Sequence, residues 1–448
     1  MPVNYSTIKA ISEPDAMATL LSERILQPIL PLVQVKKVRA KLGRRFEAPR
    51  ILWNVYEAQL EMPGGIELQP LIWTKAIFED SECERYRARL DPLLSAQNGN
   101  PLDPNGYARF FPELNLFLFI FPADPAFPSL PTVVHPDSVL PIVTEHFRRL
   151  RPSATIRGVS PVRVKYLPEI SCIIRYEADV GEADPLTIYG KVQPTRRGIL
   201  TYEVMKALWD LPARAGGDLV LAEPLAYHKH LELLLQSAVP GKEVEGDRHS
   251  EVFRAQCEAA GRTIGYIHNS GIGVGQSHTV DTEIDRIGNR LEEFKMSSPN
   301  VYLMLRELMT HVASAAQRIP PEAVVPSHGD YKYNQFLYDG ERFGLIDVEY
   351  FVQAEPSFDL GKYCGHLQPS MPQDWSDTVA ADEARRIFLD AYISVRPHYH
   401  GARFPIYEAL SLATRALVVT WGQSRNWEYT ARTLIALAHE KLKTRWGE

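Results

Sequence analysis

The stretch VVPSHGDYKYNQFLYDGERFGLIDVEYFVQAEPSFDLG, residues 324–361, decides the fold and contains the predicted site. Two short apolar runs within it, 335–338 and 343–346, are joined by a segment with the pair Asp-Gly, and this pattern predicts a β-hairpin. Asp330 precedes the first run and Asp347 follows directly on the second. A tight hairpin therefore brings two carboxylates that are 17 positions apart to the same end of one small sheet.

Several polar side chains gather around this hairpin, and together they suit the transfer of a phosphoryl group from ATP to a hydroxyl or amine. One carboxylate is needed to accept the proton of the acceptor, which is the role we expect for Asp330. A second carboxylate and an amide oxygen are needed to hold Mg²⁺, because magnesium prefers hard oxygen ligands, and Asp347 with Gln335 fit that role. Lys332 is placed to offset the charge that develops on the transferred phosphate.

The same residues resemble the catalytic loop and the metal-binding segment of the aminoglycoside phosphotransferase and choline kinase superfamily. The resemblance rests on His-Gly-Asp at 328–330, the amide at Gln335, Ile-Asp at 346–347, and the later Asp359, which is similar to the superfamily's downstream structural aspartate. It implies an α+β, bilobal fold similar to that of protein kinases. It also implies an ATP- and Mg²⁺-dependent phosphotransferase that acts on a hydroxyl group of a small molecule.

Two positions depart from the pattern of the superfamily. Its usual metal-binding Asn falls five residues after the catalytic Asp, where this chain has Gln335, whereas Asn334 lies one position early. Glutamine offers the same acceptor oxygen on a longer arm, so we favour Gln335 and keep Asn334 as the alternative metal ligand. Lys332 stands where the superfamily usually has His, and it is more similar to the lysine of protein Ser/Thr kinases.

Two other interpretations stay open at this point. An ordinary hairpin with solvated acids would also contain the motif at 328–330, which alone occurs by chance in many proteins. A non-catalytic relative, such as a nucleotide-binding pseudokinase or a scaffold module, would keep the fold and fits the substitution at Gln335. The ordered set of His, Gly, Asp, amide, hairpin and second Asp favours the enzyme, because every acidic and basic group that the chemistry needs is present.

Upstream of this stretch, the sequence predicts three successive strands and then a helix, at 162–167, 171–178, 186–192 and 200–209. Lys191 lies at the end of the third strand. The resemblance implies that a lysine there holds the α- and β-phosphates of ATP. Glu203, on the helix, is expected to pair with this lysine and orient it.

No glycine-rich GxGxxG sequence lies between the first two of these strands. The turn there is Leu-Pro-Glu-Ile-Ser, 167–171, and the backbone amides near Ser171 are expected to cover phosphate. A further apolar strand at 230–235 leads into Gln-Ser-Ala-Val-Pro, which resembles the hinge between the lobes. The backbone groups of Gln236 and Ala238 are therefore expected to bind adenine.

A length of 448 residues exceeds one compact core, so several structural units are expected. We predict a strand-rich N-terminal cap module at 1–155, a kinase-like small lobe at 156–240 and a mostly helical large lobe at 241–448. Apolar runs in the cap module predict strands at 50–61, 66–78 and 110–121, a helix at 83–94 and an extended Pro-rich connector at 121–131. Apolar spacing in the large lobe predicts helices at 253–267, 284–294, 380–395, 407–421 and 429–446.

The cap module and the small lobe share a faint internal repeat. Val-Tyr-Glu-Ala at 55–58 and Trp-Thr-Lys-Ala-Ile at 73–77 echo Arg-Tyr-Glu-Ala at 175–178 and Tyr-Gly-Lys-Val at 189–192. From tyrosine to lysine there are 19 positions in the first copy and 15 in the second. A duplication and the similar composition of unrelated strands both explain such an echo. The length, the N-terminal cap and the Gln at the metal position also resemble maltokinases.

The composition, with 45% hydrophobic and 23% charged residues, is that of a soluble globular protein. A net charge of −6 gives no reason to expect nucleic-acid binding. The four cysteines are far apart and predict neither a disulfide framework nor a zinc site, and no apolar run is long enough to cross a membrane. We expect a cytoplasmic enzyme that binds ATP and a small-molecule acceptor, first a sugar and second an aminoglycoside or amino alcohol.

Overall fold

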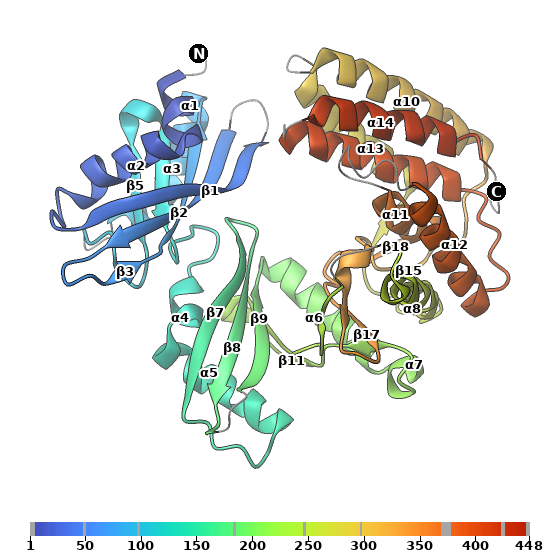
Figure 1. Ribbon diagram of the computed structural model, residues 1–448, viewed down its shortest axis with the longest axis horizontal. Helices are drawn as coiled ribbons and strands as arrows, with labels where there is room; N and C mark the ends of the chain where they lie inside the picture. Colours follow the sequence, from blue (N-terminus) through green and yellow to red (C-terminus); the bar gives the residue numbers. More distant parts are fainter. Residues whose placement is uncertain are drawn as a thin grey trace. The chain divides into compact units, whose positions relative to one another are not determined.

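The computed structural model describes residues 5–47, 51–95, 99–181, 185–244, 248–295, 298–368, 378–422 and 426–444. The chain divides into two compact units (Figure 1). The first consists of Met1–Thr195 and His228–Leu235, and the second of Arg196–Tyr227 and Gln236–Glu448. Helices and antiparallel sheets occur together, so the predicted α+β class is confirmed. The finer division with boundaries near residues 155 and 240 stays a prediction.

The first unit begins with an antiparallel sheet of strand order β1–β2–β4–β6–β5, in which the short β3 lies beside β2. Its strands are β1 Gln34–Glu47, β2 Ile51–Glu61, β3 Glu67–Leu68, β4 Leu71–Ile77, β5 Tyr107–Phe111 and β6 Leu116–Ile120. Its helices are α1 Tyr5–Ser12, α2 Pro14–Leu21 and α3 Asp80–Ser95. Met17 and Leu21 of α2 share an apolar cluster with Leu118, while Tyr86 of α3 packs edge-on against Phe117. Because adjacent residues of a strand point to opposite faces, helices cover both faces of β6.

The second sheet has the strand order β7–β8–β9–β12–β11. Its strands are β7 Gly158–Leu167, β8 Ser171–Asp179, β9 Leu186–Val192, β11 Pro224–His228 and β12 Leu233–Ser237. Two helices, α4 Leu130–Val134 and α5 Pro136–Leu150, precede it, and α6 Thr195–Trp209 follows β9. The three strands and the helix that the sequence predicts for the small lobe are therefore present, within a few residues of the expected bounds.

The two sheets share one arrangement of elements, which the faint sequence repeat only hinted at. In both, three sequential strands and a helix precede two shorter strands, and the last strand in sequence inserts beside the third. The two shorter strands are joined each time by a single 3₁₀ turn, Pro112–Leu114 or Lys229–Leu231. A left-handed residue follows each turn, Asn115 with φ 46° and Glu232 with φ 53°.

The register of the central strand pair is also the same in the two sheets. The facing positions are Tyr56–Ile72 and Trp53–Lys75 in the first sheet, and Tyr176–Ile188 and Ile173–Lys191 in the second. Lys75 and Lys191 thus occupy equivalent places. The unequal tyrosine-to-lysine spacing comes from the connection between the strands, which in the first sheet is longer and contains β3.

Four predictions for individual elements are wrong, and the first is the single strand predicted at 66–78, which is the two strands β3 and β4. The single strand predicted at 110–121 is two strands, because Pro112 cannot donate a ladder hydrogen bond and begins a 3₁₀ turn. The strand predicted at 230–235 begins only at Leu233, after the second 3₁₀ turn. The Pro-rich segment after β6 forms tight turns and is not extended, since Asp124 accepts hydrogen bonds from the backbone N–H groups of Ala126, at 2.8 Å, and Phe127, at 3.2 Å.

The second unit contains two small sheets, of strand order β10–β17–β16–β13 and β14–β18–β15. Their strands are β10 Val220–Leu221, β13 Lys242–Glu243, β14 Gln276–His278, β15 Val325–Ser327, β16 Phe336–Tyr338, β17 Phe343–Leu345 and β18 Val352–Ala354. The predicted hairpin is confirmed, because Phe336 faces Leu345 and Tyr338 faces Phe343 in antiparallel pairing.

Helices make up most of the second unit. Besides α6, they are α7 Pro212–Ala215, α8 Glu251–His268, α9 Val280–Leu291, α10 Pro299–Arg318, α11 Pro356–Leu367, α12 Thr378–Val395, α13 Phe404–Gly422 and α14 Trp427–Lys441. One apolar cluster joins α9, α10, α13 and α14, and Figure 1 shows the last three side by side. Helices α10 and α11 were not predicted from the sequence. Within the described residues, no helix is long and apolar enough to cross a membrane.

Candidate active site

A buried aspartate fixes the loop that carries the predicted catalytic residue. Asp359 lies on α11 and is fully buried, and its carboxylate accepts hydrogen bonds from the backbone N–H groups of His328, at 2.7 Å, and Gly329, at 2.9 Å. His268 Nε2 lies 3.3 Å away. Burial acts to raise the pKa of Asp359, but its bonds with His268 and the attraction of nearby histidines hold it below the usual value. The charged carboxylate therefore holds the backbone of 328–329, in agreement with a structural role.

Gly329 takes a backbone conformation that only glycine can adopt at this place. Its φ is +86°, and a Cβ atom there would lie 1.9 Å from the carbonyl oxygen of Tyr350. Lys362 Nζ donates to the carbonyl of Gly329 at 2.7 Å. Gly329 is thus held at both its N–H and its carbonyl, which fixes the backbone that leads into Asp330.

Two lysines face the carboxylate of Asp330. Lys332 Nζ lies 2.7 Å from Oδ2, and Lys362 Nζ lies 3.5 Å from Oδ1. Lys332 was predicted from the sequence and Lys362 was not, although Lys362 follows Asp359 by one helical turn and so shares its face of α11. Burial lowers the pKa of Lys362, against the attraction of Asp330 and Glu283.

The two candidate amide ligands differ in burial. Gln335 is buried, its Oε1 accepts from the backbone N–H of Lys332 at 2.9 Å, and its carbonyl accepts from Ile346 at 2.9 Å. That last bond places Gln335 beside the residue that precedes Asp347. Asn334 is exposed. Because an amide oxygen has two acceptor sites, Gln335 retains capacity for a cation. Which of the two amides binds metal stays a prediction.

Asp347 has an unusual backbone conformation. It follows β17 with φ +69°, a left-handed value that costs a residue with a Cβ about 1 kcal/mol. Residues held in such conformations often belong to functional sites. One carboxylate and one amide oxygen at the end of the hairpin suit Mg²⁺, which keeps several waters and needs few protein ligands. No cluster of three or more His, Cys, Asp or Glu side chains that would suit a zinc-type site occurs among residues that the structure describes.

A cavity of about 760 Å³ opens beside this loop. Asp330 and Lys332 line it, together with side chains from α9, α11 and α13. The side chain of Asp330 is 23% exposed, so its carboxylate is accessible from the cavity. The volume is that of a typical small-molecule site.

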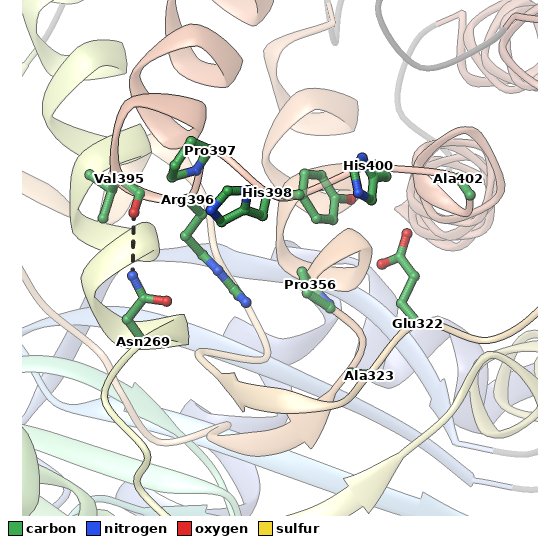
Figure 2. Close-up of a pocket in the computed structure, with 12 residues that line it drawn as sticks. Asn269, Glu322, Ala323, Pro356, Val395, Arg396, Pro397, His398, His400 and Ala402 are labelled. Atoms are coloured by element: carbon green, nitrogen blue, oxygen red, sulfur yellow. Dashed lines mark hydrogen bonds between the residues drawn. The ribbon is translucent and has the colours of Figure 1, made fainter.

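A second cavity, of about 570 Å³, is bordered by residues 395–402 after α12 (Figure 2). Asn269 lies on one side, where its Nδ2 donates to the carbonyl of Val395 at 3.4 Å. Glu322 lies on the other side and accepts from Ser357 Oγ at 2.8 Å. The described lining of this cavity includes none of the predicted site residues, so the cavity at Asp330 is the candidate active site.

Two residues that are predicted to bind or cover the ATP phosphates, Lys191 and Ser171, lie in the first unit. Lys191 is next to the last residue of β9 and half-buried, and Ser171 is the buried first residue of β8. The turn before Ser171 is held from the first sheet through Glu169, whose φ is 58°. Lys75 Nζ lies 2.5 Å from Glu169 Oε2, Tyr86 donates to Oε1 at 2.8 Å, and Asp124 Oδ2 accepts from the Glu169 N–H at 2.9 Å.

The remaining predicted residues lie in the second unit. Gln236 belongs to β12 and Ala238 follows it, and this segment continues into β13, which pairs with β16 of the hairpin. Glu203 is exposed on α6. The predicted hinge and the hairpin of β16 and β17 are therefore brought together. That Lys191 and Glu203 pair, and that Lys191 faces the same cleft as Asp347, stay predictions.

Known proteins match this chain in structure. No protein-family model matches it, and no curated protein matches it in sequence. A provisionally named aminoglycoside phosphotransferase from Ralstonia eutropha is 17% identical with a TM-score of 0.49, over 68% of this chain and 98% of the other. A choline/ethanolamine kinase family protein from Mesorhizobium loti is 16% identical with a TM-score of 0.44, over 68% and 95%. A spectinomycin phosphotransferase in complex with ADP and spectinomycin is 11% identical with a TM-score of 0.47, over 69% and 98%.

These structures belong to the superfamily that the sequence resembles. By name they are phosphotransferases or kinases of small molecules. With TM-scores below 0.5, the similarities do not identify the reaction or the acceptor of this chain. Those are inferred from the residues of the site.

Proposed function

We propose that this chain transfers the γ-phosphoryl group of ATP, in the presence of Mg²⁺, to a hydroxyl group of a small molecule. The observation that carries the proposal is the position of Asp330. Its carboxylate borders a cavity of ligand size, on a loop that the buried Asp359 holds by two hydrogen bonds. A carboxylate that is fixed in this way can orient the hydroxyl of the acceptor and take its proton as a general base.

In the proposed reaction, the acceptor oxygen forms the new bond to phosphorus, its proton passes to Asp330, and ADP leaves with the electrons of the broken bond. Lys332 and Lys362 flank Asp330 and offset the negative charge that spreads over the transferred group. Before the reaction, Lys191 holds the donor phosphates and Glu203 orients it. Backbone groups near Ser171 cover the phosphates, and those of Gln236 and Ala238 bind adenine.

Gln335 and Asp347 would hold the metal ion in this proposal. Their positions are joined by the bond between the Gln335 carbonyl and the Ile346 N–H. When bound, Mg²⁺ supplies positive charge that neutralises the phosphate oxygens. Asn334 remains the second candidate ligand, on the exposed side of the same turn.

The test is Asp330→Asn, which keeps the size of the side chain and removes its basicity. We expect ADP release with acceptor to fall by a factor on the order of a hundred or more, because general-base assistance is lost. Nucleotide binding, measured by thermal shift with ATP and Mg²⁺, should persist. The control is Asp339→Asn, an exposed aspartate in the turn of the same hairpin. Equal activity of Asp330→Asn and wild type would remove Asp330 from the mechanism.

A second candidate function is nucleotide binding without catalysis. The observation that favours it is the turn at 167–171, which is held by Lys75 and Asp124 where active kinases have a glycine-rich loop. ATP binding without turnover for every acceptor, in wild type as in Asp330→Asn, would support this alternative.

A further inference from the structure

A histidine that the proposed reaction does not use lines the cavity beside Asp330. His366 lies in the last turn of α11, one helical turn after Lys362, and its side chain is half-buried. The pKa of His366 is lowered by burial and next by the charge of Lys332. Because Lys332 Nζ lies 2.7 Å from Asp330 Oδ2, His366 and Asp330 border one region of the cavity.

A hydrogen bond with the backbone fixes which nitrogen of His366 carries a proton. Its Nδ1 lies 2.8 Å from the carbonyl oxygen of Lys362. A carbonyl oxygen can only accept a hydrogen bond, so Nδ1 is the protonated nitrogen that donates it. In a neutral imidazole the other nitrogen then has no proton and is an acceptor. The second nitrogen of His366, Nε2, is therefore a hydrogen-bond acceptor.

The charge state of His366 agrees with this assignment, since a charged ring would donate from both nitrogens. Burial, followed by the charges of Lys332 and Arg415, lowers the pKa of His366 to about 3. The hydrogen bond to the Lys362 carbonyl acts in the opposite direction and does not outweigh them. At neutral pH the ring is therefore uncharged, and Nε2 keeps its lone pair.

The Nε2 atom of His366 makes no hydrogen bond with any residue that the structure describes. The two nitrogens lie on different edges of the imidazole ring. Because Nδ1 is turned toward the backbone of α11, Nε2 is directed away from it, and the ring borders the cavity. An acceptor that loses water without gaining a partner is unfavourable. A ligand that fills this cavity is therefore favoured when it brings a hydrogen-bond donor to Nε2.

We infer that His366 Nε2 accepts a hydrogen bond from the phosphoryl acceptor, which therefore carries a second donor group, a hydroxyl or an amine, besides the hydroxyl at Asp330. This inference rests on the proposed function, and its own support is the fixed orientation of His366 in the cavity. It makes His366 a specificity-determining residue. Polyhydroxyl compounds and amino sugars fit this requirement, whereas an alcohol with one hydroxyl and no other donor does not.

The first experiment concerns the ring itself and needs no acceptor. In the full chain with ¹⁵N-labelled histidine, NMR distinguishes a ring nitrogen that carries a proton from one that does not. The signals of His366 are identified as those that disappear in His366→Gln. We expect a protonated Nδ1 and an unprotonated Nε2 at neutral pH. A protonated Nε2 would overturn the inference.

The second experiment compares acceptors that differ at one hydroxyl. The probes are methyl glucoside, glycerol and cyclohexanediol, each with derivatives in which one hydroxyl is replaced by an amine, a methoxy group or hydrogen. Binding is measured by calorimetry to the full chain saturated with Mg²⁺ and a non-hydrolysable ATP analogue. At the position that contacts His366, the methoxy and hydrogen derivatives should bind about tenfold more weakly, because Nε2 stays unpaired, and the amine should bind like the parent.

Variants of His366 identify that position. His366→Phe keeps a ring and removes the acceptor, so the difference between the hydroxyl and methoxy forms should vanish there and stay at the hydroxyl that binds Asp330. His366→Gln offers an amide oxygen and should restore part of the difference. The matched control is His398→Phe, an exposed histidine that lines the second cavity, and it should behave as wild type. If His366→Phe does not fold, His366→Leu takes its place.

The outcomes separate the inference from the proposed function. Equal binding of hydroxyl and methoxy forms at every position in wild type would overturn the inference. The same differences in wild type and His366→Phe would also overturn it, as would no binding of any probe at millimolar concentration while the ATP analogue binds. Failure of the ATP analogue to bind at all would instead overturn the proposed function.

Discussion

The sheets β1–β2–β4–β6–β5 and β7–β8–β9–β12–β11 have equivalent strand orders and the same register in their central strand pair, yet their equivalent lysines have different surroundings. Lys75 is 8% exposed, and its ammonium lies 2.5 Å from Glu169 and 4.5 Å from the centre of the Tyr86 ring. Lys191 is half-buried at the end of β9. One scaffold thus carries a lysine in an internal ion pair and a lysine at the position predicted for a phosphate ligand.

The partner of Lys75 explains what the first sheet does. Glu169 lies in the turn between β7 and β8 of the second sheet, which is the turn expected to cover the ATP phosphates. Asp124, from the segment after the first sheet, also accepts the Glu169 N–H. A buried lysine is stable only when it is paired, so the position of Lys75 and that of the turn depend on each other. The first sheet and the segment after it therefore hold this turn in place.

The largest expected effect comes from exchanging the two lysines one at a time for methionine. Lys191→Met should lower kcat/KM for ATP by a factor on the order of a hundred, because one fixed charge on the phosphates is lost. Lys75→Met should keep most of the activity but lower the free energy of unfolding by about 2 kcal/mol, because Glu169 loses its cation. Steady-state kinetics and denaturant unfolding measure the two. A similar decrease of kcat/KM in both variants would contradict the assignment of different roles to Lys191 and Lys75.

A smaller effect is expected from loosening the turn without touching either lysine. Glu169→Gln removes the charge that pairs with Lys75 and keeps an oxygen for Tyr86. We expect KM for ATP to rise severalfold with little change in kcat, because the loss falls on ground-state binding. The control is Glu67→Gln in the exposed end of β3. A lower melting temperature with an unchanged KM would mean that the contact is structural only.

The smallest effect is a dependence of stability on pH that arises at Asp124. Burial raises the pKa of Asp124, although it accepts hydrogen bonds from Glu169, Tyr166 and Ala126. The folded state therefore holds this proton to a higher pH than the unfolded state does, so the contribution of Asp124 to stability falls as pH rises from its ordinary value of 3.8 through the raised value. Asp124→Asn should flatten that part of the curve, as measured by urea unfolding between about pH 4 and 7. If the free energy of unfolding of Asp124→Asn depends on pH as steeply as that of wild type, another group is responsible for the dependence.

Much of the site was predictable because its determinants are local in the chain. Asp330, Gln335 and Asp347 belong to one hairpin, and the pair Asp-Gly fixes where it turns. The strand that ends near Lys191 was predictable for a similar reason, because the apolar residues that indicate it are neighbours in the chain. Helices α10 and α11 were missed, and α11 carries both Asp359 and Lys362, so the second lysine at Asp330 was missed with it.

What the sequence alone determined is which side chains meet at the loop and the hairpin, since neighbouring residues and turn preferences suffice to place those groups. Only the tertiary structure decided the partner of Lys75, the second lysine at Asp330 and the cavity that Asp330 borders. These depend on contacts between residues far apart in the chain, such as Lys75 with Glu169 and Lys362 with Gly329. Such contacts are set by how helices and sheets pack, and the pattern of residues within one segment does not reveal them.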